Sequence, residues 1–239
     1  MSAATPEEAV RVTPLGDRAL VVGLGDRIGE LAFQRVRAAV ECLDGFHPAI
    51  TDLVAGFTSV TVHYDPSVVA RLSAELPHVA LTQAIGQRLR ALGPRALPQS
   101  RLVEIAVCYA ADFAPDLEEV ARHAALPVEA AIALHSSATY SVHMIGFAPG
   151  FPYLAGLDAR LATPRRAEPR TRVAAGSVGI GGEQTGIYPI TTPGGWNIIG
   201  RTPLVLFDAR RDPAVLLHVG DRVRFVPISR DQFDAEAGV

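Results

Sequence analysis

Four arginines crowd one short segment in the second half of the chain. Residues 164–172 read Pro-Arg-Arg-Ala-Glu-Pro-Arg-Thr-Arg, and the two prolines oppose a helix there. A guanidinium can hold a carboxylate or a phosphate through two parallel hydrogen bonds. The segment, with Arg165 and Arg170 as its candidate residues, therefore predicts capture of an anionic substrate or of an acidic patch on a partner. A solvated loop is the alternative.

A second candidate is the stretch from Gly146 to Tyr153, which contains two glycines, two prolines and three aromatic residues. Proline fixes φ and glycine permits positive φ, so such a stretch forms a rigid, irregular loop. We interpret it as a preorganised surface for a ligand or a partner, with a turn whose aromatic residues cap the fold as the alternative. Its candidate binding residues are Phe147, Pro149, Gly150, Phe151 and Tyr153.

The only tryptophan follows a double glycine in Pro193-Gly194-Gly195-Trp196, where the glycines let another part of the molecule approach closely. Trp196 is interpreted either as a core residue or as an interface anchor. His135, at a predicted helix end, and His143, on the following strand, are the candidate groups for proton transfer. A helix C-terminus would raise the pKa of His135, which favours a structural role for it.

The composition excludes several classes of function. All 22 basic residues are arginine, which rules out a Walker A loop, a Schiff-base lysine and a lysine nucleophile. The formal charge of 22 − 25 = −3 gives no reason to expect nucleic acid or an anionic membrane as partner. Cys42 and Cys108 form no CxxC pair, so neither a disulfide nor a metal site is expected. With no signal peptide and no apolar run of ~18 residues, the chain is expected to be cytoplasmic.

The glycine-rich stretch from Val178 to Gly186 is only superficially similar to a dinucleotide-binding fingerprint. Gln184 stands where the third glycine should be. Tyr188-Pro189 and Pro193 prevent the helix whose N-terminus would hold a pyrophosphate. A Rossmann site is therefore not expected.

These candidates must be positioned by two regions of the chain that differ in their predicted secondary structure. In the first region, apolar residues at three- and four-residue steps predict helices over 30–43 and 77–92, and alternation predicts a strand over 60–64. Residues 93–100 lack periodicity and hold two prolines and a glycine, so we place the linker there. The expected domains are an N-terminal α/β domain at 1–95 and a second domain at 96–239.

The second region reads as mainly β. A strand over 103–107 precedes two helices, and the first of these is expected to open with a capping box of Asp116 and Glu119. From Tyr140 onward, about seven short β-like runs alternate with Gly- and Pro-rich turns, which brings the total to about eight strands. This pattern predicts a closed barrel or a sandwich.

Several motifs occur in an order and spacing typical of one family. They are Gly-Phe-Ala-Pro-Gly-Phe-Pro-Tyr-Leu from 146, Thr-Pro-Arg-Arg from 163, Pro-Arg-Thr-Arg-Val from 169, Ala-Gly-Ser-Val-Gly-Ile from 175 and Pro-Gly-Gly-Trp-Asn-Ile-Ile-Gly-Arg-Thr-Pro from 193. With Pro14 to Leu20 and Thr58 to Val60, the chain resembles the family of 5-oxoprolinase B-type subunits, also called KipI or allophanate hydrolase subunit 1. The resemblance implies an α+β fold, in which a small N-terminal α/β domain is followed by a cyclophilin-like β-barrel.

The resemblance also implies a function within a complex. Family members open 5-oxoproline to L-glutamate at the expense of ATP, together with a second cyclophilin-like protein, the C-type subunit, and with the A-type subunit. Gln184, Tyr188 and Arg201 lie in the family motifs and join the candidate substrate- or partner-binding residues. Arg165, Arg170 and Arg201 suit the negative charge of a phosphorylated, imidate-like intermediate. The chain does not indicate where ATP binds.

Two other functions stay open at this point. The KipI name implies a non-catalytic inhibitor of a histidine kinase, which would bind without turnover. A relationship to urea carboxylase implies a carboxyl-transfer subunit, which would need a biotin carrier on another chain because this one has no lysine. The allophanate hydrolase activity itself needs a serine, serine and lysine triad, which the chain cannot host for the same reason.

Overall fold

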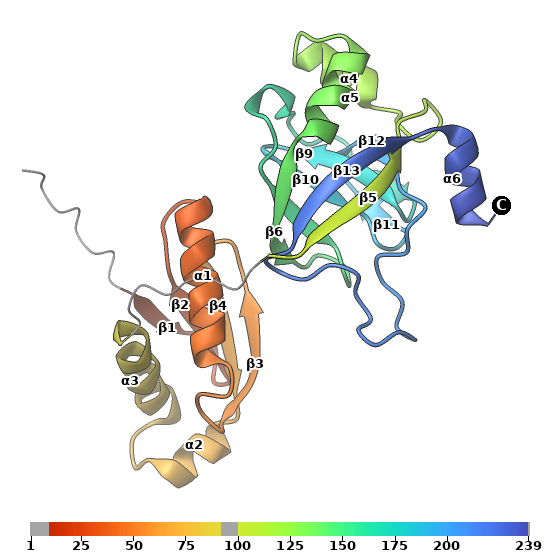
Figure 1. Ribbon diagram of the computed structural model, residues 1–239. Helices are drawn as coiled ribbons and strands as arrows, with labels where there is room; N and C mark the ends of the chain where they lie inside the picture. Colours follow the sequence, from red (N-terminus) through yellow and green to blue (C-terminus); the bar gives the residue numbers. More distant parts are fainter. Residues whose placement is uncertain (1–9, 92–99, 239) are drawn as a thin grey trace, which may run out of the picture. The chain divides into compact units, whose positions relative to one another are not determined.

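The chain divides into two compact units, residues 1–99 and 100–239, called the first and the second unit below (Figure 1). The computed structural model describes residues 10–91 and 100–238. The predicted boundary after residue 95 and nearly all of the predicted linker at 93–100 lie outside the described residues. The exact position of the boundary therefore stays a prediction.

The first unit is a four-stranded antiparallel sheet covered by helices. Its strands are β1 (Arg11–Pro14), β2 (Ala19–Gly23), β3 (Ile50–Ala55) and β4 (Ser59–Tyr64), in the order β1-β2-β4-β3. Its helices are α1 (Glu30–Leu43), α2 (Pro66–Leu72) and α3 (Pro77–Arg90). Helix α1 contacts β3 and β4, α3 contacts β1 and β2, and the two helices contact each other, so they share one face of the sheet.

The apolar spacing of the sequence explains the two long helices. In α1, Phe33, Val36 and Leu43 are buried and Val40 is half-buried, which follows the predicted three- and four-residue steps, and the helix has the predicted bounds. Helix α2 was not expected. Asp65 begins it by accepting a hydrogen bond from the Ser67 backbone N–H at 2.9 Å, and Pro66 occupies its first turn.

The second unit contains a closed barrel of seven strands. They are β5 (Leu102–Cys108), β6 (Thr139–Ile145), β7 (Pro152–Ala155), β9 (Ser177–Gly181), β10 (Gln184–Ile187), β12 (Asn197–Arg201) and β13 (Arg222–Ile228). Their order around the barrel is β10-β7-β6-β13-β5-β12-β9. The strands β8 (Arg170–Val173) and β11 (Thr192–Gly194) pair separately as a two-stranded ribbon. The expected fold class is confirmed, although the unit has one strand more than the expected eight.

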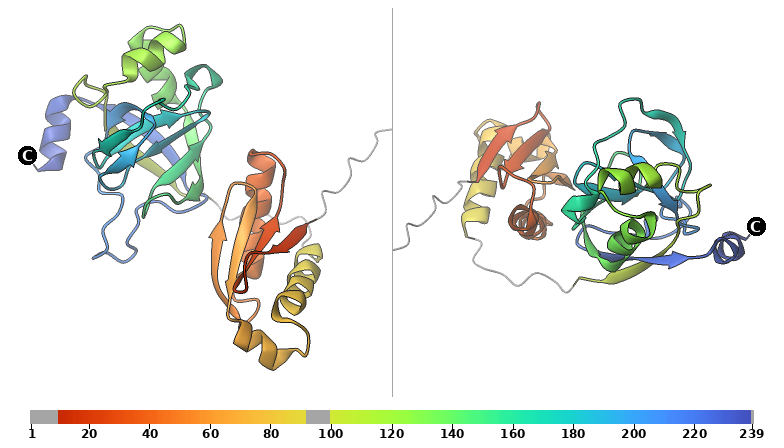
Figure 2. Two further views of the ribbon diagram at one scale, coloured as in Figure 1. Left: turned by 180° about the vertical axis from the view of Figure 1, so that it is seen from behind. Right: turned by 90° about the horizontal axis from the view of Figure 1, so that it is seen from above.

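Helices and an apolar interior complete the second unit. Helices α4 (Leu117–His123) and α5 (Val128–Ser137) lie side by side at one end of the barrel, a short 3₁₀ turn spans Ala159–Leu161, and α6 (Arg230–Ala237) follows β13 (Figures 1 and 2). The barrel core includes Ile105, Tyr140, Val178 and Phe225, which are fully or almost fully buried. The glycine-rich stretch at 178–186 forms the β9–β10 hairpin.

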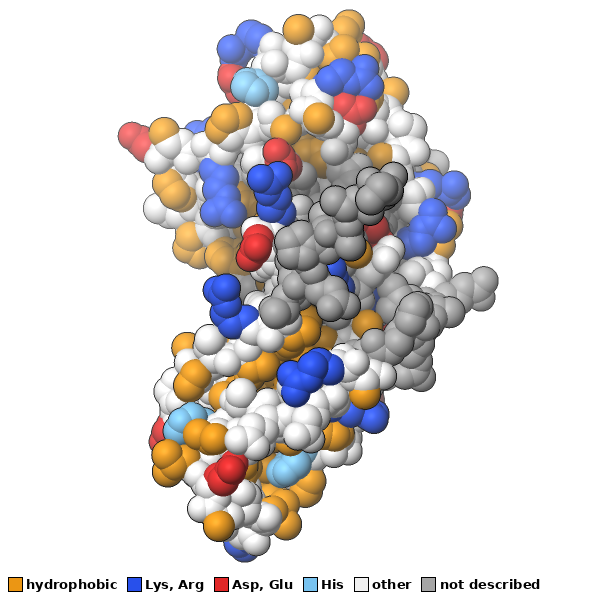
Figure 3. Space-filling model, turned by 90° about the vertical axis from the view of Figure 1, so that its left-hand side faces the viewer, with side chains coloured by type: hydrophobic (Ala, Val, Ile, Leu, Met, Phe, Trp, Pro, Cys, Tyr) orange, Lys and Arg blue, Asp and Glu red, His pale blue; other side chains and the backbone are white. Residues whose placement is uncertain are grey.

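The surface carries both signs of charge. Figure 3 shows arginine and acidic side chains interspersed on the face in view. This distribution agrees with the small formal charge of −3. None of the helices within residues 10–91 and 100–238 combines the length and the apolar character that a membrane span requires.

Candidate functional site

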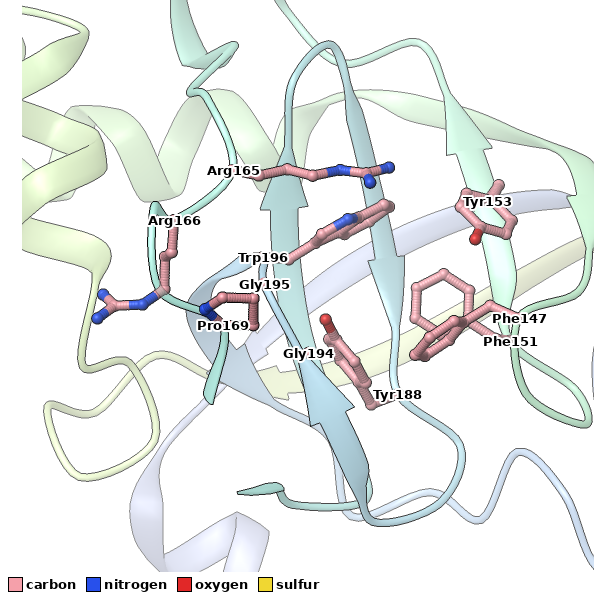
Figure 4. A pocket seen from close by; sticks show the side chains of 10 residues that line it. All are labelled: Phe147, Phe151, Tyr153, Arg165, Arg166, Pro169, Tyr188, Gly194, Gly195 and Trp196. Carbon is pink, nitrogen blue, oxygen red and sulfur yellow. The ribbon is translucent and has the colours of Figure 1, made fainter. Parts of the chain in front are cut away.

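A half-open hollow of about 190 Å³ lies in the second unit and is called the aromatic hollow below (Figure 4). Its lining consists of five aromatic residues, two arginines, a proline and two glycines. They are Phe147, Phe151, Tyr153, Tyr188 and Trp196, then Arg165, Arg166, Pro169, Gly194 and Gly195. The structure thus brings together the aromatic loop, the arginine segment and the Gly-Gly-Trp motif, which the sequence singled out separately.

Phe151 is the centre of the aromatic wall. Its ring centroid lies 5.2 Å from that of Tyr188 and 5.4 Å from that of Trp196, with the rings nearly perpendicular in both pairs. Edge-to-face pairs of this kind are favoured by the aromatic quadrupole. Phe151 and Trp196 are buried, whereas Phe147 is 62% exposed at the rim. The wall is therefore rigid at its base and apolar at its edge.

Glycines make room for the indole of Trp196. A Cβ at Gly181 would lie 2.5 Å from the indole Nε1, and a Cβ at Gly186 would lie 2.6 Å from the Pro152 carbonyl oxygen and 3.0 Å from the indole. Both glycines are on the β9–β10 hairpin. The indole therefore packs directly against backbone, in the close approach that glycine permits.

Phe147 holds a backbone conformation that few side chains adopt. Its φ is +67°, in the left-handed region. A bulky residue in this region is strained by about 1–3 kcal/mol, and such strain is concentrated at functional sites. The exposed ring is held there by edge contacts with Phe151 and Tyr188. The strain supports a role in binding for Phe147.

Only one of the candidate arginines is directed at the aromatic residues. In Figure 4 the Arg165 side chain runs alongside Trp196 toward Tyr153, whereas Arg166 points the opposite way. Within the described part of the chain, no acidic side chain forms an ion pair with Arg165. Burial raises the pKa of the Tyr153 hydroxyl, and the positive charge of Arg165 opposes this shift. Of the two arginines that line the hollow, Arg165 is thus the one that lies along its aromatic residues.

Arg170 and Arg166 bind an internal carboxylate instead. Arg170 donates two hydrogen bonds of 2.8 Å to the two oxygens of Asp116, and Arg166 donates one of 2.9 Å. The Ile198 backbone N–H donates a fourth at 2.7 Å. The expected capping box is therefore wrong. Asp116 does precede helix α4, but its side chain makes no cap hydrogen bond because these four donors occupy it.

His135 lies inside the barrel and does not line the aromatic hollow. It is 1% exposed and stacks on Phe225 with a centroid separation of 4.5 Å. Thr185 Oγ1 donates to the Gly179 carbonyl oxygen at 2.9 Å, so it accepts from His135 Nε2 at 3.1 Å. His135 Nδ1 then accepts from the Tyr109 hydroxyl at 2.9 Å. The neighbours thus fix one neutral tautomer.

The expected direction of the His135 pKa shift is wrong. Burial lowers the pKa to about 3, whereas the helix C-terminus was expected to raise it. Desolvation disfavours the imidazolium, and the hydrogen bonds around the ring suit the neutral form. At neutral pH the residue is an uncharged part of the core, so a structural role fits it better than proton transfer.

This burial predicts an acid-sensitive second unit. Between pH 6.5 and about pH 3, His135 is protonated in the unfolded chain but neutral in the folded chain. The free energy of unfolding therefore falls as the pH is lowered through this range. Chemical unfolding followed by Trp196 fluorescence between pH 7 and 5 would measure the slope, and His135→Gln, which is neutral throughout, should flatten it. Equal slopes in the two proteins would contradict this assignment.

The remaining predicted site residues lie away from the aromatic hollow. Arg201 donates to the Ala175 carbonyl oxygen at 3.0 Å and lies over the Phe113 ring, 5.6 Å from its centroid. His143 is buried on β6. Pro149 and Gly150 belong to the aromatic loop, and Gln184 begins β10, but none of the three lines the hollow. Their roles stay predictions.

Sequence reasoning missed the partners of these residues. Asp116 is 54 positions from Arg170, and Thr185 is 50 positions from His135. Nothing local in the sequence pairs them. Asp116 was interpreted as a helix cap from its spacing to Glu119, and no local pattern indicated that its carboxylate would be buried among several donors.

An α/β unit followed by a closed barrel with a hollow on it is the architecture of a carboxyltransferase-type domain. Residues 10–217 match the family described as "Carboxyltransferase domain, subdomain C and D". The chain is 42% identical to the 5-oxoprolinase B subunit of Bacillus subtilis (strain 168), over 94% of this chain and 95% of that protein. It is 43% identical to the protein of the same name from Escherichia coli O157:H7, over 89% and 94%. It belongs to the family of 5-oxoprolinase B-type subunits, which confirms the resemblance seen in its motifs.

Solved structures show the same fold. TTHA0988 matches with a TM-score of 0.75 and 36% identity over 89% of this chain, which spans only 40% of the TTHA0988 chain. PH0987 from Pyrococcus horikoshii matches with a TM-score of 0.55 and 38% identity, over 93% of this chain and 100% of that one. The Kluyveromyces lactis urea carboxylase has a TM-score of 0.74 at 21% identity, over 96% of this chain and 23% of that one, and it therefore shows the fold alone.

Proposed function

We propose that this chain is a subunit of an ATP-dependent 5-oxoprolinase complex of the cytoplasm. The complex opens 5-oxoproline to L-glutamate with hydrolysis of ATP, and it combines this chain with a second barrel protein, the C-type subunit, and with the A-type subunit. Membership of the B-type family supports the proposal. The observation that connects the proposed function with particular residues is the aromatic hollow, which Arg165 lines.

The hollow suits a small, flat, anionic substrate. Aromatic faces and edges pack well against a five-membered ring, and a guanidinium binds its carboxylate or the oxygen of its amide. Hydrolysis of a lactam coupled to ATP implies a phosphorylated, imidate-like intermediate whose negative charge must be stabilised. In our proposal Arg165 supplies that stabilisation. Arg170 and Arg201 are bound elsewhere within the unit, so we do not include them among the groups that meet the substrate.

Other steps belong to other chains of the complex in this proposal. His135 and His143 do not line the hollow, so the proton acceptor is assigned to the partner that completes the site. ATP is used by the complex in this proposal, and the sequence of this chain has no phosphate loop that would mark a binding site for it.

Reconstitution of the three proteins tests the proposal. Release of glutamate and phosphate from 5-oxoproline and ATP should require this chain together with its A-type and C-type partners. If those two partners alone turn over at the full rate, the proposed function is wrong. If all three proteins together remain inactive with 5-oxoproline and ATP, the proposed substrate is wrong.

Phe147 is the proposed contact with the second barrel protein. It is a large apolar side chain, 62% exposed, and already held in place. Aromatic residues of this kind carry much of the energy of an interface. We expect Phe147→Ala to weaken association about tenfold or more, with stability changed by only about 0.5 kcal/mol. Titration calorimetry against the C-type partner checks this, with Leu102→Ala, which is 47% exposed on β5, as the control. Equal affinities of the two variants would contradict the assignment.

A carboxyl-transfer function is the second candidate, because the matching family is described as a carboxyltransferase domain. A protein with this function would act on a carboxylated biotin carried by another chain. Turnover that depends on bicarbonate and a biotinylated carrier, and that occurs without 5-oxoproline, would favour this candidate over the first.

A further inference from the structure

A buried carboxylate lies behind the arginine segment. The side chain of Asp116 is 6% exposed, and it accepts the three guanidinium hydrogen bonds and the Ile198 N–H described above. One backbone hydrogen bond also joins the two residues, since the Asp116 N–H donates to the Ile198 carbonyl oxygen at 3.0 Å. A carboxylate with four donors and little solvent is firmly fixed in place.

This carboxylate determines where two guanidiniums point. In Figure 4 the Arg166 side chain points away from the aromatic side chains. Its guanidinium forms an ion pair of 2.9 Å with Asp116. Arg170 binds Asp116 in bidentate fashion, with its side chain 25% exposed. Because both are directed at the same carboxylate, Arg165 is left as the guanidinium that accompanies the aromatic wall.

The same region also fixes the backbone on both sides of Arg165. The side-chain amide of Asn197 donates to the Pro164 carbonyl oxygen at 2.9 Å. The Arg166 backbone N–H donates to the Gly195 carbonyl oxygen at 2.8 Å. Arg165 thus lies between two residues that are both tied to the stretch 195–198, to which Asp116 is tied as well.

We infer that Asp116 is a positioning residue of the aromatic hollow, which holds Arg166 and Arg170 away from the ligand and so makes the hollow selective for ligands with a single negative charge. The inference rests on the proposed function and deepens it. Loss of the Asp116 charge would release two guanidiniums next to the hollow and raise the local formal charge by one. The second carboxylate of a dicarboxylate ligand could then bind the guanidiniums of Arg166 and Arg170, which are bound to Asp116 in the native protein.

The experiment measures charge selectivity through Trp196, the only tryptophan of the chain and part of the wall of the hollow. The full chain is titrated with 5-oxoproline, cyclopentanecarboxylate and cis-cyclopentane-1,2-dicarboxylate while the fluorescence is followed. The native protein should prefer the monocarboxylates. In Asp116→Asn the ratio of the two cyclopentane dissociation constants should shift about tenfold toward the dicarboxylate. Arg172→Gln, an exposed arginine of the same segment that does not line the hollow, should leave the ratio unchanged.

A role in stability alone predicts a different result. Partial unfolding of Asp116→Asn would weaken both cyclopentane ligands by the same factor, and an unchanged ratio would therefore overturn the inference while leaving the proposed function intact. Failure of the native chain to bind any of the three ligands would overturn the inference together with the site assigned under the proposed function.

A charge-matched pair covers the case in which Asp116→Asn does not fold. Arg166→Gln and Arg170→Gln each remove one positive charge beside the same carboxylate, but Arg170 donates two of the three guanidinium hydrogen bonds and Arg166 only one. Positioning by Asp116 predicts that neither substitution changes the ratio of the two cyclopentane dissociation constants by more than about twofold, because neither guanidinium meets the ligand and Asp116 still holds the one that remains. A loss of dicarboxylate binding about fivefold or more in either variant, with monocarboxylate binding unchanged, would show that the removed guanidinium already meets the ligand in the native protein, which also overturns the inference.

Discussion

Replacing Arg165 with glutamine is expected to lower kcat/KM of the reconstituted complex for 5-oxoproline about a hundredfold, because the substitution removes one preorganised donor to the charge that develops in the reaction. Glutamine keeps a neutral donor on a shorter side chain, so the loss reports on charge, reach and bidentate geometry together. The Arg165 side chain is exposed and forms no ion pair within the described residues, so its removal should leave the fold intact. Circular dichroism of the variant chain checks this.

The control for Arg165→Gln is Arg172→Gln, which removes the same charge from the same segment at a position outside the hollow. It should retain nearly full turnover. If both variants lose activity equally, the effect is the general field of the arginine segment, and the assignment to Arg165 is incorrect. If Arg165→Gln turns over normally, the aromatic hollow is not where the charge of the reaction develops.

Local patterns in the sequence predicted local features well. The spacing of apolar residues placed α1 correctly, and the density of glycine, proline and aromatic residues between 146 and 153 marked the loop that lines the hollow. The strand predicted over 60–64 from its alternation also agrees with β4. In each case the cause is short-range: helix periodicity, a fixed φ, or the two faces of a strand.

Long-range partners explain what the sequence could not predict. The sequence singled out Arg165 and Arg170 among the four arginines of the segment, and only the fold shows that one carboxylate binds Arg170 together with Arg166. The pKa of His135 was misjudged for the same reason. The helix end is visible in the sequence, whereas the barrel interior that outweighs it is assembled from strands far apart in the chain. Ion-pair partners and burial are properties of the folded unit, so the structure was needed to assign roles to these residues.

Replacing Gly181 with alanine is expected to destabilise the second unit by about 3 kcal/mol, the upper part of the usual range for overpacking a filled core. The new Cβ would lie 2.5 Å from the indole Nε1 of Trp196. The indole cannot simply move away, because Phe151 lies edge-on against it and Gly186 lies close to its other end. Backbone strain adds nothing at this position, since Gly181 is not among the glycines with positive φ.

Urea unfolding followed by Trp196 fluorescence measures the effect in the second unit alone, because the first unit contains no tryptophan. Gly195→Ala is the matched control. Gly195 lines the same hollow, and a Cβ there would meet only Pro169 at an ordinary 3.6 Å, so stability should change by less than about 1 kcal/mol.

The clash at Gly181 moves the aromatic wall that the ligand contacts. Gly181→Ala should therefore also lose 5-oxoproline binding under conditions where it remains folded. A Gly181→Ala protein with native stability and native binding would show that the indole has freedom to move, and that the aromatic wall is not the rigid surface on which the proposed selectivity depends.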